Sequence, residues 1–534
     1  MRLKPEDRQE QGDRDSLIRR FSVAVSSGPE RFALRSGERR LTYRELDEWS
    51  DAVAGILRSR GIRRGDRVAL RMVPEAEAIT AILGILKCGA SYVPLDVRHP
   101  ASRKEFIVAD SGVCALVGEW GEGTLGPAVG ILVGTAEVAS ALASCAARPA
   151  GRAAQPAGSL PTAQDTAYII YTSGTTGSPK GVPVRHCHVT ALLSGAEAVF
   201  EFGAQDRWLL FHSIAFDFSV WEIWGALSTG AELVVLPHGA TRSPDQCLQA
   251  VAQHGITVLN QTPTAFASIA EAAVRAGAEL PALRYVVFGG EKLVPAGLRH
   301  WVKTYGLSQP RLVNGYGITE TTVFTTFHEI GEDDLAGDES TIGVALPGFR
   351  VRVVGDDGRD VPVGRLGELW LAGPQVTDGY LNRPELTAER FSTAADPASG
   401  AVLRYYRSGD LVSLAPDGSL VYQGRADLQV KLRGYRIELS DIEAAVRRHE
   451  AVLDAVVSVR EFKAADSRLV CAYVTRAGAA APEQRQLRQH IKELLPSYMH
   501  PARYLRLSEL PRTVNGKVDR AAVARAWEEG KEHI

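Results

Sequence analysis

Short apolar runs alternate with longer amphipathic segments along much of the chain, and this alternation limits the possible folds more than any other feature. The clearest strand–helix–strand units lie at 66–72, 75–87 and 91–95, and at 231–236, 244–254 and 256–260. A further apolar run at 283–288 ends in two glycines and is typical of a buried strand. Because such alternation is characteristic of α/β layer architectures, we predict an α/β fold.

The sequence pattern changes near residue 426, where we predict a domain boundary. At 534 residues the chain exceeds the size at which a single hydrophobic core stops growing. We expect a large body of layered α/β subdomains over 1–426 and a small, mobile α+β domain over 427–534.

Three local patterns refine this division. A Pro-Asp-Gly turn at 416–418 separates two strand patterns and predicts a hairpin. A helix is predicted to begin at Ser440, with Glu443 in the capping-box position. The stretch 135–163 mixes Ala, Pro, Gly and Arg with weak periodicity, so we expect a poorly ordered surface excursion there.

Charge and cysteine usage exclude several classes of protein. Lys and Arg number 61 against 63 Asp and Glu, so nothing suggests a surface for polyanions, and nucleic acid is not an expected partner. The six cysteines are scattered without a metal-ligand spacing and are typical of reduced thiols. No apolar run approaches the roughly 20 residues that span a bilayer. We therefore expect a soluble, cytoplasmic enzyme that does not bind membranes.

The segment 171–182 (YTSGTTGSPKGV) follows an apolar run and combines glycine, hydroxyl side chains and one lysine. Glycine lets backbone N–H groups approach an anion, and Lys180 adds positive charge, so the segment could cradle phosphate. The same residues also make ordinary surface turns, and composition leaves both interpretations open. A Walker A loop is excluded, because Gly174 and Gly177 are too close together and Lys180 is followed by Gly181.

This segment resembles the signature of the adenylate-forming superfamily, which includes acyl-CoA synthetases, luciferases and nonribosomal peptide synthetase adenylation domains. Further motifs similar to those of the family occur in family order at 41–46, 86–96, 216–222, 314–320, 367–369, 379–387, 406–411, 424–434 and 515–517. The resemblance covers nearly the whole chain and is strongest to domains that activate amino acids. It implies an enzyme that uses ATP and Mg2+ to convert a carboxylic acid to its adenylate.

The resemblance assigns the ATP site residue by residue. The implied nucleotide-binding residues are Thr172, Ser173, Gly174, Thr175, Thr176, Gly177, Lys180, Gly290, Asn314, Tyr316, Gly317, Thr319, Asp410 and Arg425. Within this set Thr176 and Lys180 would guide the β and γ phosphates and Thr319 would lie near the α-phosphate. Tyr316 would stack on adenine, and the Asp410 carboxylate would accept hydrogen bonds from both ribose hydroxyls. Ile318 and Ser408 depart from the family's usual proline and threonine without removing a charged group.

Three charged residues carry the remaining roles that the resemblance implies. Glu320 would hold Mg2+, in keeping with the oxygen ligands that this ion prefers. Lys517, near the end of the small domain, would enter the active site and contact the substrate carboxylate. Asp427 matches the hinge about which the small domain swings, which would bring the loop at Gly434 to the entry of a pantetheine thiol.

The acid that is activated is predicted from Asp217, which matches the carboxylate that amino-acid-specific members place against the α-ammonium. The other implied substrate-binding residues are Phe218, Trp221, Asn260, Val287, Gly289, Gly315, Val323, Phe324 and Lys517. This set resembles the pattern of threonine-activating domains, with departures at Gly315 and Phe324. Asn260 would either hydrogen-bond a β-hydroxyl or serve as a structural amide, so L-threonine or a similar small polar amino acid is expected.

The sequence after Lys517 is short and contains no carrier-protein motif. We therefore expect a freestanding enzyme that transfers its product to the phosphopantetheine thiol of a separate carrier protein. A small MbtH-like helper protein is a further partner that the sequence neither requires nor excludes. Two alternatives stay open: an acyl- or aryl-CoA ligase of the same superfamily, disfavoured by Asp217, and a catalytically degenerate binding protein, disfavoured by the full set of charged residues.

Overall fold

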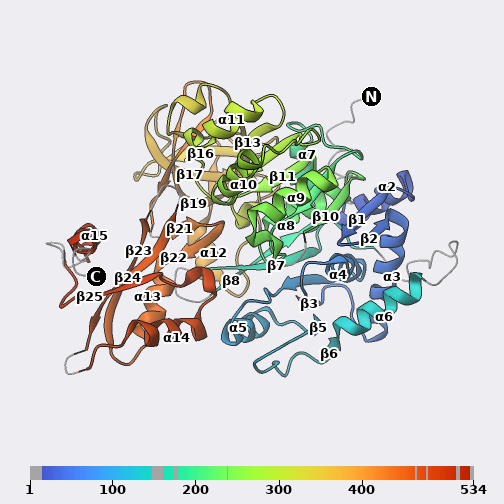
Figure 1. Cartoon of the computed structure of the whole chain (residues 1–534), viewed down its shortest axis with the longest axis horizontal. Helices are drawn as coiled ribbons and strands as arrows, with labels where there is room; N and C mark the ends of the chain where they lie inside the picture. Colours follow the sequence, from blue (N-terminus) through green and yellow to red (C-terminus); the bar gives the residue numbers. More distant parts are fainter. Residues whose placement is uncertain are drawn as a thin grey trace.

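The computed structural model describes residues 15–146, 160–173, 179–236, 239–427, 429–462, 466–476, 479–512 and 518–529. Two large sheets with helices on their faces form the body of the molecule, and a smaller unit from the C-terminal part lies beside them (Figure 1). This arrangement confirms the α/β body and the small α+β unit that the sequence predicts.

The first sheet has six strands in the described residues, in the order β6-β5-β3-β4-β7-β8. All neighbours are parallel except the last pair, β7 and β8. Its strands are β3 (Arg67–Arg71), β4 (Ser91–Pro94), β5 (Ala115–Gly118), β6 (Ile131–Val133), β7 (Thr166–Thr172) and β8 (Lys180–Arg185). The connection from β7 to β8 is the segment that the sequence singles out as a phosphate cradle.

The second sheet combines a parallel half with an antiparallel half, and its strand order ends β13-β12-β11-β9-β10-β1-β2. The parallel half and its edge are β1 (Phe32–Ser36), β2 (Arg39–Thr42), β9 (Arg207–Leu210), β10 (Glu232–Val235), β11 (Val258–Gln261), β12 (Tyr285–Phe288) and β13 (Arg311–Tyr316). The antiparallel half is β14 (Thr326–Glu329), β15 (Ser340–Ala345), β16 (Arg350–Val354), β17 (Leu366–Ala372), β18 (Phe391–Ala395), β19 (Val402–Leu414) and β20 (Leu420–Arg425).

Helices cover both sheets and divide the core into layers. One core lies between the sheets and includes α2 (Leu17–Ser27), α3 (Tyr43–Ser59), α4 (Ala76–Lys87), α7 (His186–Ala196) and α8 (Phe218–Leu227). The outer face of the second sheet packs on α9 (Pro244–His254), α10 (Pro263–Ala276) and α11 (Arg299–Tyr305). The outer face of the first sheet packs on α5 (Ala101–Ser111). Helices on the outer faces bury one side, whereas α4 and α8 lie in the core between the sheets and are buried on nearly all sides.

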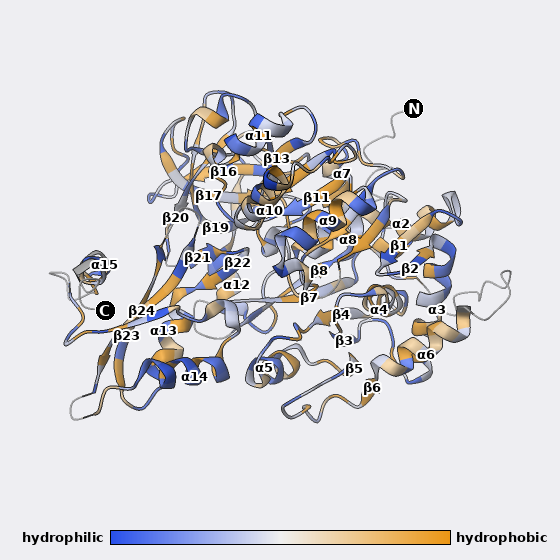
Figure 2. Cartoon of the chain, viewed as in Figure 1, coloured by the Kyte–Doolittle hydropathy of each residue, from blue (hydrophilic) through white to orange (hydrophobic). Residues whose placement is uncertain are grey.

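The small unit has its own sheets and its own core. Its strands are β21 (Gln429–Leu432), β22 (Tyr435–Glu438), β23 (Val452–Glu461), β24 (Ser467–Thr475) and β25 (Arg503–Arg506), in the pairs β21-β22 and the sheet β23-β24-β25. Its helices are α13 (Leu439–Arg447), α14 (Gln484–Leu494) and α15 (Arg520–Glu529). Helix α14 is largely hydrophilic in Figure 2 and buries only Leu487 and Ile491. The separate core agrees with a distinct domain.

The structure confirms several local predictions and corrects two. The strand–helix–strand unit at 66–95 and the hairpin of β19 and β20 are present. Part of the expected excursion at 135–163 is a helix, α6 (Thr135–Ala146), because Val138 and Leu142 pack into the inter-sheet core. The predicted capping box is absent, because Glu443 instead accepts the Val457 N–H. None of the described helices could cross a membrane, since none is both long and apolar enough.

Close approach of α8 to β9 positions the candidate site and yields a stability prediction. A Cβ placed on Gly225 of α8 would lie 2.4 Å from a ring carbon of Trp208 on β9. Overpacking a tight core costs about 1–3 kcal/mol. We expect Gly225→Ala to lower the thermal midpoint of the body by several degrees, measured by calorimetry; an unchanged midpoint would show that the helix can move away from the sheet.

Candidate active site

Asp217 lies at the N-terminus of α8, where its side chain is available for a ligand. Although Asp217 is the residue before the first helical turn, its carboxylate makes no capping hydrogen bond. It is only 6% exposed, and burial raises the pKa of Asp217 although a hydrogen bond from Thr319 opposes that change. No basic group within the described segments lies at ion-pair distance from it. A buried carboxylate of this kind is stabilised by an incoming cation.

The residues of the predicted substrate pocket come from α8 and from the parallel strands that it faces. Phe218 and Trp221 lie on α8, whereas Asn260 and Val287 are partners on β11 and β12. The Trp221 indole donates to the Asn260 carbonyl oxygen at 2.9 Å. The Asn260 amide nitrogen is buried and lacks a hydrogen-bond partner among the described atoms. Because the hydrogen bond from Trp221 holds the Asn260 side-chain oxygen toward α8, the amide nitrogen of Asn260 faces away from this helix.

The loop between β13 and β14 is sharply folded and carries Thr319 and Glu320. A Cβ on Gly317 would lie 2.0 Å from the Val323 carbonyl oxygen, so glycine is required there. Thr322 and Val323 have positive φ angles of 59° and 66°, which β-branched residues rarely adopt. Backbone strain of this kind persists where the surrounding structure imposes it and is common at functional sites.

Glu320 is fully buried in a cluster of cations and hydroxyls. One carboxylate oxygen accepts from the Tyr380 hydroxyl at 2.6 Å and lies 3.1 Å from the Lys180 ammonium. The other accepts from the Arg436 guanidinium at 2.7 Å. Burial opposes ionisation of Glu320, but Arg436, Lys180 and the hydrogen bond from Tyr380 outweigh it and hold its pKa below the ordinary value. Burial also lowers the pKa of Lys180 to about 8, despite the attraction of Glu320.

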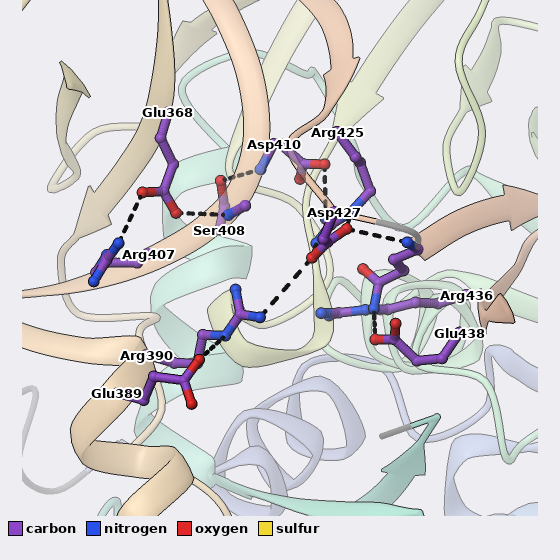
Figure 3. Close-up of polar contacts among 12 residues, drawn as sticks. Glu368, Glu389, Arg390, Arg407, Ser408, Asp410, Arg425, Asp427, Arg436 and Glu438 are labelled. Atoms are coloured by element: carbon purple, nitrogen blue, oxygen red, sulfur yellow. Dashed lines mark hydrogen bonds and ion pairs between the residues drawn. The ribbon is translucent and has the colours of Figure 1, made fainter. Parts of the chain in front are cut away.

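A second buried carboxylate, Asp410, connects the nucleotide side of the site to the predicted hinge. It accepts from the Tyr316 hydroxyl at 2.5 Å and from Arg425 at 2.8 Å. The same Arg425 side chain donates to both carboxylate oxygens of Asp427 at 2.7 Å, and Arg390 lies 3.9 Å from Asp427 (Figure 3). Arg425 therefore links Asp410, the ribose-binding carboxylate that the resemblance implies, to Asp427, the implied hinge residue.

The residues present fit a nucleotide with a divalent cation. The hydroxyl oxygens of Thr172 and Ser340 are buried and have no hydrogen-bond partner among the described atoms, and Ser340 lines a small cavity with Asn314 and Tyr316. In the described segments, His, Cys, Asp and Glu side chains form no group of three or more that could hold a metal. A Mg2+ ion at Glu320 would therefore need phosphate oxygens as its other ligands, which is its usual arrangement with nucleotides.

The small unit closes over this site in the structure. The Gly434 N–H donates to Glu291 at 2.9 Å, and the Ser173 hydroxyl donates to the Arg436 carbonyl oxygen at 2.7 Å. Lys431 lies 5.2 Å from the centre of the Tyr316 ring. A groove of about 990 Å³ between the two units is lined by Phe216 and, from the small unit, Tyr435. Phe216 also lines the cavity beside Asp217, so the groove leads toward the site.

The structure brings most of the predicted site together, and it adds residues that the sequence analysis did not assign. Gly174, Thr175, Thr176, Gly177 and Lys517 lie outside the described residues. The added residues are Arg436, Tyr380 and Lys431, each of which contacts a predicted site residue. Tyr380 and Lys431 lie inside motifs that carry the resemblance, so motif membership was the available signal for these two, whereas Arg436 lies just beyond the motif at 424–434 and had no such signal.

Comparisons with known proteins decide the family. The family model for the AMP-binding enzyme matches residues 21–381, and that for the AMP-binding enzyme C-terminal domain matches 441–517. The chain belongs to the AMP-binding enzyme family. It is 41% identical to syringomycin synthase SyrB1 of Pseudomonas syringae pv. syringae, over 94% of this chain and 80% of that protein. It is also 41% identical to a dimodular nonribosomal peptide synthase of Bacillus subtilis, over 95% of this chain but 21% of that protein.

Solved structures of adenylation domains share the fold of this AMP-binding enzyme. PA1221, a nonribosomal peptide synthetase protein containing adenylation and PCP domains, superposes with a TM-score of 0.81 at 29% identity, over 96% of this chain and 84% of that one. An artificially fused adenylation–PCP di-domain from Klebsiella oxytoca gives 0.79 at 27% identity, over 97% of each chain. The chain is thus an ATP-dependent, AMP-forming ligase of the nonribosomal peptide synthetase adenylation type, which confirms the predicted reaction class.

Proposed function

We propose that this enzyme activates a small α-amino acid, with L-threonine or a similar small polar amino acid as the best candidate. The observation that carries the proposal is Asp217, a buried carboxylate that does not cap its own helix. An α-ammonium group would supply the ion-pair partner that Asp217 lacks among the described residues, whereas a fatty or aryl acid would leave the carboxylate without one. The choice of threonine rests on the pocket pattern that includes Phe218, Trp221 and Asn260.

In the proposed reaction the amino-acid carboxylate attacks the α-phosphorus of ATP and pyrophosphate leaves. Asp217 orients the amino acid through its ammonium group, and Asp410 with Tyr316 positions the adenosine. Lys180 adds positive charge where the β and γ phosphates develop charge on leaving. Glu320, with phosphate oxygens, would hold Mg2+, and the ion would neutralise charge on the triphosphate. Much of the rate enhancement would come from holding the amino-acid carboxylate and the triphosphate together in a reactive arrangement.

We further propose that the aminoacyl group then passes to the phosphopantetheine thiol of a carrier protein. The groove beside Phe216 and Tyr435 supports this step, because it leads toward the adenylate from the junction of the two units. The solved relatives PA1221 and the Klebsiella oxytoca fusion contain PCP domains. In this scheme residues 427–534 move about Asp427 as one domain relative to 1–426. The CoA-ligase alternative is disfavoured because Asp217 would have no partner in it.

The proposal is tested by amino-acid-dependent exchange of labelled pyrophosphate into ATP. The panel should contain the proteinogenic amino acids, several aryl acids and short fatty acids, each measured with purified enzyme and Mg2+. We expect exchange with threonine or another small α-amino acid and background exchange with aryl and fatty acids. Exchange with an aryl or fatty acid alone would establish the CoA-ligase alternative instead.

Replacing Lys517 by alanine is expected to remove most amino-acid-dependent exchange while the protein keeps its thermal midpoint. The lysine cation would offset repulsion between the carboxylate and the triphosphate, so it acts on the reaction more than on folding. Lys492, an exposed basic residue near the end of α14, provides the matched control as Lys492→Ala. Near-normal exchange by Lys517→Ala would refute the role given to this residue.

A further inference from the structure

Arg436, on strand β22 of the small unit, contacts two parts of the body that are implied to bind the triphosphate and its metal. Its guanidinium donates to Glu320 at 2.7 Å. Its backbone carbonyl oxygen accepts from the Ser173 hydroxyl at 2.7 Å, near the start of the predicted phosphate-binding segment. Arg436 also lines two small cavities beside Thr319, one of which borders Asp217. In this closed pose, Arg436 therefore lies at the triphosphate end of the candidate site.

The hairpin of β21 and β22 holds Arg436 in this position. Within the hairpin, Lys431 pairs with Arg436. At its tip the Gly434 N–H donates to Glu291 of the body at 2.9 Å, and a Cβ placed on Gly434 would lie 2.8 Å from the Thr262 methyl group. The Arg436 side chain is only 13% exposed. Because both the backbone and the side chain are confined, the guanidinium leaves Glu320 only when the hairpin moves.

Each carboxylate oxygen of Glu320 already has a partner in the closed pose. One accepts from the Tyr380 hydroxyl and lies 3.1 Å from the Lys180 ammonium, and the other accepts from Arg436. A Mg2+ ion binds a carboxylate oxygen at about 2.0–2.1 Å and surrounds itself with a near-octahedral shell of oxygen ligands. A guanidinium N–H directed at the same oxygen intrudes on that shell, and its positive charge repels the ion. Arg436 and Mg2+ therefore cannot both neutralise Glu320.

We propose that Arg436 and Mg2+ compete for Glu320, so that Arg436 is a positioning residue that closes the small unit only when the metal-bound triphosphate is absent. This inference rests on the proposed function and adds the group that couples closure to the metal. When ATP binds with Mg2+, the hairpin would leave the body; when pyrophosphate departs with the metal, Arg436 would return to Glu320. A ligand shifts a protein toward the pose that it binds better. The exchange of counter-ions keeps the fully buried Glu320 paired in both poses.

Calorimetric titration of ATP over a series of Mg2+ concentrations, without amino acid, measures this competition. For Arg436→Ala we expect the Mg2+ concentration that gives half-maximal ATP binding to fall about 10-fold, because no competing group reduces the binding-competent fraction. Arg436→Lys keeps a cation and should stay within about 3-fold of the wild type. Arg447→Ala is the matched control and should behave as the wild type, because Arg447 pairs with Asp454 inside the small unit.

Hydrogen–deuterium exchange of β21 and β22 measures the pose of the hairpin without depending on activity. The informative amide is that of Gly434, because it donates to Glu291 across the two units. In the wild type, ATP with Mg2+ should increase exchange of the peptide that contains this amide at least about 5-fold, since opening removes its protection. AMP, which lacks the β and γ phosphates, should change the exchange of this peptide by less than about 2-fold.

Two results would overturn the inference while leaving the proposed function intact. One is an equal Mg2+ requirement for ATP binding in the wild type and Arg436→Ala. The other is a wild-type hairpin whose amide exchange does not change when ATP and Mg2+ bind. ATP binding that is independent of Mg2+ in every one of these proteins would instead refute the metal-holding role that the proposed function gives to Glu320.

Discussion

Replacing Asp217 by asparagine is expected to raise the KM for the amino acid by about 10²- to 10³-fold. The substitution keeps the size of the side chain but removes the charge that would face the α-ammonium group. Removing one member of a buried ion pair costs about 3–5 kcal/mol, and each 1.4 kcal/mol corresponds to a factor of ten. The side chain does not cap α8, so the helix should lose little stability.

The control for this prediction is ATP affinity, measured by calorimetry on the same protein. Asp217 contacts Thr319, whereas the predicted ribose carboxylate is Asp410, so ATP should bind the variant within about 3-fold of the wild type. A second control, Asp245→Asn, removes a carboxylate that is exposed on α9. An unchanged KM for the amino acid in Asp217→Asn would remove the ammonium-binding role.

Replacing Glu320 by glutamine is expected to lower the kcat of adenylate formation by at least about 10³-fold. The carboxylate is the residue proposed to hold Mg2+, and its loss would leave charge on the triphosphate without its counter-ion. The change also removes the carboxylate that raises the pKa of Lys180, which burial lowers to about 8, so the buried ammonium loses its counter-ion. Both effects act on the transition state, where phosphate charge develops.

Glu329→Gln is the matched control, because Glu329 lies in the next strand, β14, and pairs with Arg311 near the surface. Exchange by Glu329→Gln should stay within about 3-fold of the wild type. For Glu320→Gln, raising Mg2+ tenfold should recover little activity. Exchange close to wild type at ordinary Mg2+ would show that Glu320 neither holds the metal nor balances Lys180.

Much of the body of the fold could be predicted from the sequence, because its signals are local. The alternation at 66–95 gave β3, α4 and β4 within about two residues, and the turn at 416–418 gave the hairpin of β19 and β20. The helix α6 was missed because most of its apolar residues are alanines, which give a weak periodic signal. Only contact with the inter-sheet core, which sequence periodicity does not report, buries Val138 and Leu142.

The candidate site, like the fold, could be predicted from the sequence only in part. The motifs indicated that Asp217, Glu320 and Asp410 are site residues, and the structure places all three among buried groups. They did not indicate that Arg436 reaches Glu320 from the small unit, or that Phe324 rests on Gly315. These contacts join residues that are distant in the sequence or depend on the path of a strained loop. Packing of this kind follows from the whole fold.

The most direct test of the central claim is detection of the aminoacyl-adenylate itself. The enzyme would be incubated with ATP, Mg2+, pyrophosphatase and threonine, and in parallel with 3-hydroxybutyrate, which has a β-hydroxyl but no α-amino group. Mass spectrometry of the acid-quenched mixtures would then measure the adenylates. We predict close to one threonyl-adenylate per enzyme and none from 3-hydroxybutyrate. No adenylate from threonine or any other small α-amino acid, or equal amounts from both acids, would contradict the account.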